Sequence, residues 1–141
     1  MSADTPAIRA NKQSMANAMA GNKKEWLALF ADDAIVHDPV GPSPHDPEGK
    51  GFQGRERISE FWDTMIGSGD LTIIPHKRLP CGDKIVAVVM TAANKIAGMK
   101  TYIEMVAVYE VNDNGKLVRL NVYWDVNSLN EQVAAHAAAQ G

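Results

Sequence analysis

The chain has a single cysteine, Cys81, among its 141 residues, so no disulfide can form within it. One cysteine is compatible with a reducing compartment, and we expect a cytoplasmic protein. The first residues lack the basic and apolar regions of a signal peptide, and no apolar stretch is long enough to span a bilayer. We therefore expect neither a disulfide-rich secreted domain nor a membrane protein.

An excess of charge of one sign is also missing. The net charge is −3, and 22% of the residues are charged. This balance does not provide the basic surface that nucleic acid or an anionic membrane requires. His45, Asp46 and Glu48 lie close together in the chain, but no second group of ligands follows at metal-binding spacing. We expect a solvated loop here, and we predict no metal and no other cofactor.

The pattern along the chain predicts one domain over residues 1–127 and an Ala-rich tail over 128–141, which is a frayed helix or disordered. Periodic apolar residues and alternating apolar residues predict these helices and strands: helices over 7–19, 23–30 and 55–66, the last ended by Gly67-Ser68-Gly69, and strands over 34–37, 71–79, 84–95, 99–111 and 117–126. Helices followed by a run of strands indicate an α+β fold with the helices packed on one face of a curved sheet.

Alternation separates the two faces of the predicted strands. Over residues 99–111 the odd positions are the more apolar, so we expect them to face the helices. In the last strand Val118, Leu120, Val122 and Trp124 are expected to face the same way. The opposite face mixes apolar and charged groups, which is compatible with a dimer surface or with an ordinary solvated sheet.

Three segments resemble the ketosteroid isomerases. Residues 30–41 (FADDAIVHDPVG) resemble the signature of that family, residues 54–62 its third-helix entry, and residues 112–124 its last hairpin. The second and third segments are shared with the wider superfamily of nuclear transport factor 2 and the SnoaL-like polyketide cyclases. The resemblance implies a cone-shaped α+β domain in which helices pack on the concave face of a mixed or antiparallel sheet, and it implies a homodimer.

The resemblance assigns Asp38 as the general base that moves a proton next to a carbonyl of an apolar substrate. Pro39 restricts Asp38 toward extended geometry, which would aim its carboxylate. Asp38 could instead be a turn aspartate that accepts backbone hydrogen bonds. We expect these residues to form walls of the substrate pocket, with core packing as the alternative: Trp124, Met90, Ile103 and Met105. Ser14, Ala107 and Tyr109 are also expected to contact the substrate. We expect the neighbouring His37 to be structural or at the surface.

The chain departs from the family at both oxyanion-hole donors. The resemblance places Ser14 at the position of the catalytic tyrosine and Ala107 at the position of the second acid. Tyr109 or Tyr102 could supply a donor from another position. Three functions therefore stay open: an isomerase of steroid-like or polyketide-like substrates, a non-catalytic binding protein for a small hydrophobic ligand, and a SnoaL-like cyclase or hydratase.

Overall fold

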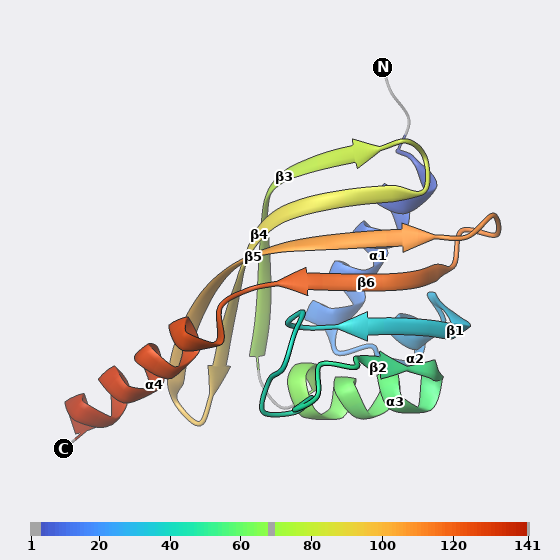
Figure 1. Cartoon of the computed structure of the whole chain (residues 1–141). Coiled ribbons are helices and arrows are strands. Elements are labelled where there is room, and N and C mark those ends of the chain that lie inside the picture. Colours follow the sequence, from blue (N-terminus) through green and yellow to red (C-terminus); the bar gives the residue numbers. More distant parts are fainter. Residues whose placement is uncertain (1–3, 68–69, 141) are drawn as a thin grey trace.

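The computed structural model describes residues 4–67 and 70–140 and shows one α+β domain (Figure 1). Its helices are α1 (Pro6–Ala20), α2 (Lys23–Leu27), α3 (Gly54–Phe61) with a π-helical turn η1 (Trp62–Ile66), and α4 (Val126–Gln140). Its strands are β1 (Phe30–His37), β2 (Phe52–Gln53), β3 (Asp70–Cys81), β4 (Ile85–Ile96), β5 (Met99–Val111) and β6 (Leu117–Tyr123).

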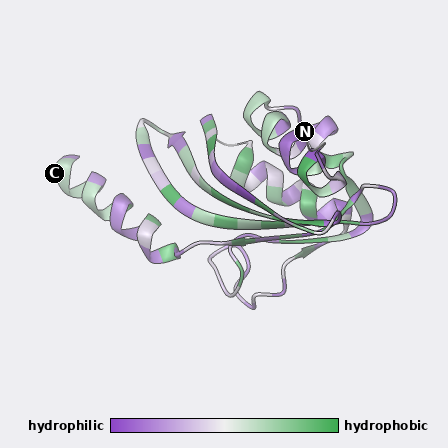
Figure 2. Cartoon of the chain, turned by 90° about the horizontal axis from the view of Figure 1, so that it is seen from above, coloured by the Kyte–Doolittle hydropathy of each residue, from purple (hydrophilic) through white to green (hydrophobic). Residues whose placement is uncertain are grey.

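The strands form one six-stranded sheet in the order β2-β1-β6-β5-β4-β3. β1 and β6 are parallel, and the other neighbouring pairs are antiparallel. The sheet curves, and α1, α2 and α3 lie on its concave side (Figure 2). This mixed, curved architecture confirms the predicted fold class. Within the described part of the chain, no helix is both long and apolar enough to span a membrane.

Helix α1 presents a regular buried face to the sheet. Thr5 caps the helix by accepting a hydrogen bond from the amide of Ile8 (3.2 Å), and Gly21 ends it in the left-handed conformation. The buried residues recur at helical spacing: Ala7, Ala10, Asn11, Ser14, Met15 and Ala18. Two of these are polar, so the helix brings polar groups to the interior.

The alternation of β5 is as predicted, since the odd positions from Thr101 to Val111 are more buried than the even ones. In β6 the prediction is wrong at one position. Leu117 is buried and Val118 is only half-buried, because the register shifts next to the β5–β6 turn. A bulge of this kind moves the following side chains to the other face.

Three predicted boundaries are also corrected. The second helix ends at Leu27, and Asp32 and Asp33 lie on the exposed side of β1. Phe52 and Gln53, for which no strand was predicted, pair with β1 as β2. The last strand ends at Tyr123, and the tail is helical from Val126. Ser68 and Gly69 of the predicted helix end lie outside the described residues.

Helix α4 extends away from the sheet (Figure 1) and buries none of its residues. Gln132 attaches it to β5 through two hydrogen bonds of 2.8 Å. The amide nitrogen of Tyr102 donates to Gln132 Oε1, and Gln132 Nε2 donates to the carbonyl of Tyr102. The side-chain amide thus pairs with the strand as a neighbouring backbone would.

Candidate functional site

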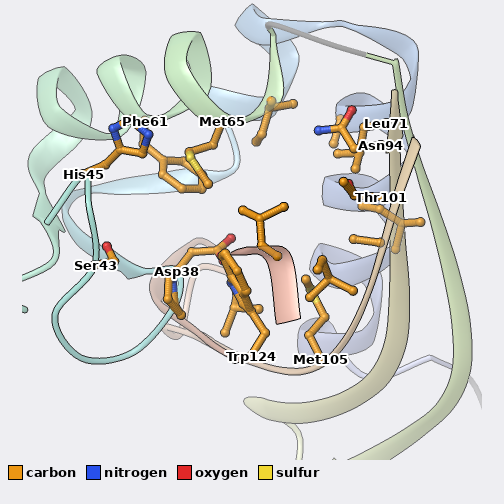
Figure 3. A pocket seen from close by; sticks show the side chains of 18 of the residues that line it. Asp38, Ser43, His45, Phe61, Met65, Leu71, Asn94, Thr101, Met105 and Trp124 are labelled. Atoms are coloured by element: carbon orange, nitrogen blue, oxygen red, sulfur yellow. The ribbon is translucent and has the colours of Figure 1, made fainter. Parts of the chain in front are cut away.

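A cavity of about 340 Å³ lies between the helices and the concave face of the sheet. This volume is in the range of small-molecule sites. Figure 3 shows Asp38 and Trp124 on one side of the cavity and Asn94 and Thr101 on the other. Most of the wall between them is apolar, and it includes Met90, Ile103, Met105, Leu120 and Val122. The cavity therefore suits an apolar ligand with polar groups near its ends.

Asp38 follows the last residue of β1, is half-buried and lines the cavity. Trp124, which follows the last residue of β6, donates a hydrogen bond from Nε1 to Asp38 Oδ1 (2.5 Å). Since β1 and β6 are neighbouring parallel strands, their carboxyl ends lie at one edge of the sheet. The indole thus orients a carboxylate that is 86 residues away in the chain.

Burial raises the pKa of Asp38 from 3.8 to about 7, and the hydrogen bond from Trp124 opposes this rise. The cause is the cost of removing a carboxylate from water without a cation to compensate it. A carboxyl group with a pKa near neutral pH is suited to taking up and releasing protons. The cavity therefore contains a carboxyl group that can exchange a proton near neutral pH.

Tyr109 lines the same cavity from β5 and is 3% exposed. Burial raises its pKa to about 12, against smaller opposing contributions from Asn11 and Ser14. The charge of Asp38 also raises it, so the phenol and the carboxylate are close enough to interact. A phenol with this pKa stays protonated at neutral pH and can donate a hydrogen bond to a ligand oxygen.

Polar side chains from two other elements surround Tyr109. Ser14 and Asn11 come from the buried face of α1. Trp26 Nε1 donates to Ser14 Oγ (3.1 Å), and Arg78 Nε of β3 donates to Asn11 Oδ1 (2.7 Å). These bonds hold both α1 side chains in place beside the phenol. The Arg78 charge lowers the pKa of Tyr109, which makes the phenol a somewhat better donor.

The residues predicted for the pocket are placed as follows. These line the cavity: Asp38, Trp124, Met90, Ile103, Met105, Ser14 and Tyr109. Ala107 does not line it; its side chain is fully buried in the core, on β5 between its strand partners Val88 of β4 and Val122 of β6. Tyr102 is on the opposite face of the sheet and is 53% exposed, so it has no access to the cavity.

Sequence reasoning missed Asn11, Asn94 and Arg78. Asn11 and Ser14 are three residues apart on a helix, so both lie on one face. This spacing could have predicted that Asn11 accompanies Ser14 at the site. No local signal relates Arg78 to the first helix.

The loop before β2 is held by its own hydrogen bonds. The Asp46 carboxylate accepts from the amides of Lys50 (3.0 Å) and Gly51 (2.8 Å). His45 lines the cavity, while the half-buried His37 ring packs directly against Gly51. Among residues 4–67 and 70–140, no three His, Cys, Asp or Glu side chains are grouped so that they could bind a metal. Asp46 therefore stabilises the loop.

Fold and cavity together define a class of protein: α+β domains whose curved sheet and helices enclose a small apolar ligand site with a carboxylate. Residues 12–120 match the model of the SnoaL-like domain. The chain belongs to the SnoaL-like family and, within it, is a ketosteroid-isomerase-like member.

Solved structures agree with this assignment. RV0760c from Mycobacterium tuberculosis is 29% identical with a TM-score of 0.87, covering 91% of this chain and 97% of that one. RV0760c has also been solved in complex with estradiol-17beta-hemisuccinate. Delta 5-3-ketosteroid isomerase from Mycobacterium sp. is 28% identical with a TM-score of 0.84, covering 88% of this chain and 96% of that one. An epoxide hydrolase of the LEH-like type from M. tuberculosis, 21% identical, shares the fold over 96% of this chain and 94% of that one, with a TM-score of 0.76.

Proposed function

We propose that this protein is a steroid Δ-isomerase-like enzyme that moves a proton next to a carbonyl group of an apolar, steroid-like substrate. The observation that supports this most is the Asp38 carboxylate, which lines an apolar cavity and has a pKa raised to about 7. A desolvated carboxylate with a raised pKa accepts a proton more readily than an ordinary carboxylate, which suits a base. No cofactor is needed for this reaction.

The reaction has two proton transfers. The Asp38 carboxylate takes a proton from the carbon between the ketone and the double bond, and the electron pair of that C–H bond moves into a dienolate. The carboxylic acid formed then returns the proton to the far carbon of the dienolate, which restores the ketone and leaves the double bond conjugated with it. Asp38 ends as it began, so the cycle needs no other reactant.

Tyr109 would stabilise the negative charge that develops on the ketone oxygen. It is a protonated donor in the same cavity, and its surroundings hold it in place before the charge appears. Ala107, which stands at the position of the family's second acid, has no group to donate. We therefore expect one strong donor in place of two, and a turnover below that of an isomerase with both.

The similar proteins support a steroid as the substrate class. One is a ketosteroid isomerase, and another was solved with an estradiol derivative bound. Both share the fold of this chain, and the cavity here is mostly apolar. Steroids with a β,γ-unsaturated ketone are accordingly the first substrates to test.

The first experiment follows ultraviolet absorbance while a β,γ-unsaturated 3-ketosteroid becomes a conjugated enone. Because only the ionised carboxylate is a base, kcat/KM should rise with pH and level off above a midpoint near 7, set by the pKa of Asp38. The range from about pH 5 to about pH 9 extends about two units to either side of this midpoint. A kcat/KM that stays constant over this range would contradict Asp38 as the base.

Trp124→Phe provides the matched variant for this profile. It keeps an aromatic ring but removes the Nε1 donor that lowers the pKa of Asp38. The midpoint should therefore move to higher pH, while the plateau above it stays within about tenfold of the original. A midpoint that moves down would mean that the indole does not stabilise the ionised carboxylate.

Binding without turnover is the second candidate, and the missing second donor favours it. The enone assay combined with a titration of tryptophan fluorescence separates the two functions, since a binding protein would show saturable quenching by estradiol and form no enone. Trp26 and Trp124 both line the cavity, so a bound steroid would contact an indole.

The homodimer expected from the resemblance has a candidate surface on the outer face of the sheet. Val89, Val106 and Tyr123 are exposed and adjacent, because Val106 pairs with Val89 on one side and with Tyr123 on the other. We expect sedimentation velocity to give the mass of two chains. The mass of one chain at micromolar concentration would contradict this part of the proposal.

A further inference from the structure

The far end of the cavity contains an unexplained polar group. Asn94 of β4 and Thr101 of β5 are directly paired in the sheet, and both line the cavity. Thr101 is 7% exposed. Asn94 Oδ1 is buried and has no hydrogen-bond partner. A buried carbonyl oxygen without a donor is rare, because it has lost its hydrogen bond to water, so the site is expected to receive a partner from elsewhere.

The Asn94 amide is on the opposite side of the cavity from Asp38 (Figure 3). Trp124 follows the Val106–Tyr123 pair, which puts it at the level of Met105 on β5. Thr101 lies four residues further along the same strand, about 13 Å away at 3.3 Å per residue. A fused four-ring skeleton can bridge this separation.

The wall between the two polar ends contains side chains that offer only apolar surface to a ligand, among them Ile103, Met105, Met90 and Ala92. A ligand that fills the cavity is therefore apolar along its length. On the sheet side of the cavity the polar groups lie at its two ends, with Asp38 and Tyr109 at one end and Asn94 and Thr101 at the other.

We propose that Asn94, with Thr101 beside it, forms a subsite for a hydroxyl group on the end of the ligand remote from the reacting ketone. An amide offers a donor and an acceptor, which a half-turn about its last torsion exchanges. A hydroxyl group can both donate and accept, so it matches either end of the amide, whereas a ketone only accepts. The substrate class is then an apolar polycyclic ketone with a distal hydroxyl, and the orientation rests on the proposed function of Asp38.

The test compares three probes that differ only on the five-membered ring: estradiol, estrone and the deoxy analogue of estradiol. Isothermal titration should show estradiol binding about tenfold more tightly than the deoxy analogue, with estrone between them. Asn94→Leu keeps the size of the side chain and removes both polar atoms. In that variant the three affinities should converge, mostly through weaker binding of estradiol.

Asn130→Ala is the matched control, because Asn130 also lines the cavity but comes from α4. It should keep the order of affinities. Convergence in Asn130→Ala but not in Asn94→Leu would overturn the assignment. An equal loss of affinity for all three probes in Asn94→Leu would place the phenol ring that the probes share at Asn94, and it would overturn the proposed orientation of the ligand. Equal binding of the three by the unmodified protein, or no binding of any, would overturn the subsite.

These outcomes are separate from the test of catalysis. Discrimination at the distal hydroxyl in a protein that forms no enone would support the subsite and contradict the isomerase. Enone formation by a protein that binds the three probes equally would support the isomerase and contradict the subsite.

Discussion

Asp38→Asn should lower kcat for enone formation by about 10²–10⁴-fold, because the amide cannot accept the proton from the substrate carbon. Binding of estradiol should persist or improve, since the variant no longer places a charge against an apolar ligand. Spectroscopic turnover and isothermal titration measure the two effects separately.

Asp33→Asn is the control for this variant. Asp33 is an exposed aspartate on the same strand, so the same change there should leave turnover unaltered. If Asp38→Asn retained more than a tenth of kcat, another group would be the base.

Asp38→Asn should also be more stable than the unmodified protein at neutral and alkaline pH. The pKa of Asp38 is about 7 in the folded chain and near 3.8 when the side chain is in water. The folded state therefore binds the proton more tightly, and the free energy of unfolding falls as pH rises from about 4 to about 7. Asn has no such titration, so urea denaturation at pH 8 should show a gain of about 2–4 kcal/mol.

This gain should shrink as the pH is lowered toward 4, where Asp38 is protonated in both states. If the free energies of unfolding of Asp38→Asn and the unmodified protein differed by the same amount at every pH in this interval, the Asp38 carboxylate would not be desolvated. The result would weaken the proposed role of Asp38 even if turnover were lost.

Tyr109→Phe should lower kcat by about 10²–10³-fold, with little change in estradiol binding. The variant removes one hydroxyl from the cavity and leaves the ring that packs in the core. The hydroxyl is most valuable when the ketone oxygen becomes an anion, so its loss affects the transition state more than the bound ligand.

Tyr102→Phe provides the comparison on the outer face, where the phenol is exposed and only its backbone is bonded to Gln132. It should have no effect on kcat. Should Tyr109→Phe keep full turnover, the charge would have to be stabilised elsewhere, and Ser14 would be the next hydroxyl to replace.

Much of the fold is predictable from local patterns. Thr5-Pro6 and Gly21 delimit α1, and the alternation from Thr101 to Val111 assigns the inner face of β5. These features depend on neighbours in the chain, which is why they can be predicted. The β6 bulge and the early start of β1 at Phe30 could not be, since pairing with other strands decides both.

The site divides in the same way. Asp38 is identifiable because a run of residues around it resembles a known family. Its partner Trp124 was expected only as a wall, and the hydrogen bond between them requires two strand ends to meet. Ala107 was expected to contact the substrate, but its side chain is fully buried and does not line the cavity.

The sequence by itself determined the class of fold and singled out one carboxylate, because periodicity and a contiguous motif are local properties. Only the tertiary structure decided what surrounds that carboxylate. The raised pKa of Asp38, the position of Tyr109 in the same cavity and the unpaired side-chain oxygen of Asn94 all result from desolvation and proximity. Such effects arise from side chains of several elements packed around one cavity, and no short stretch of the chain contains them.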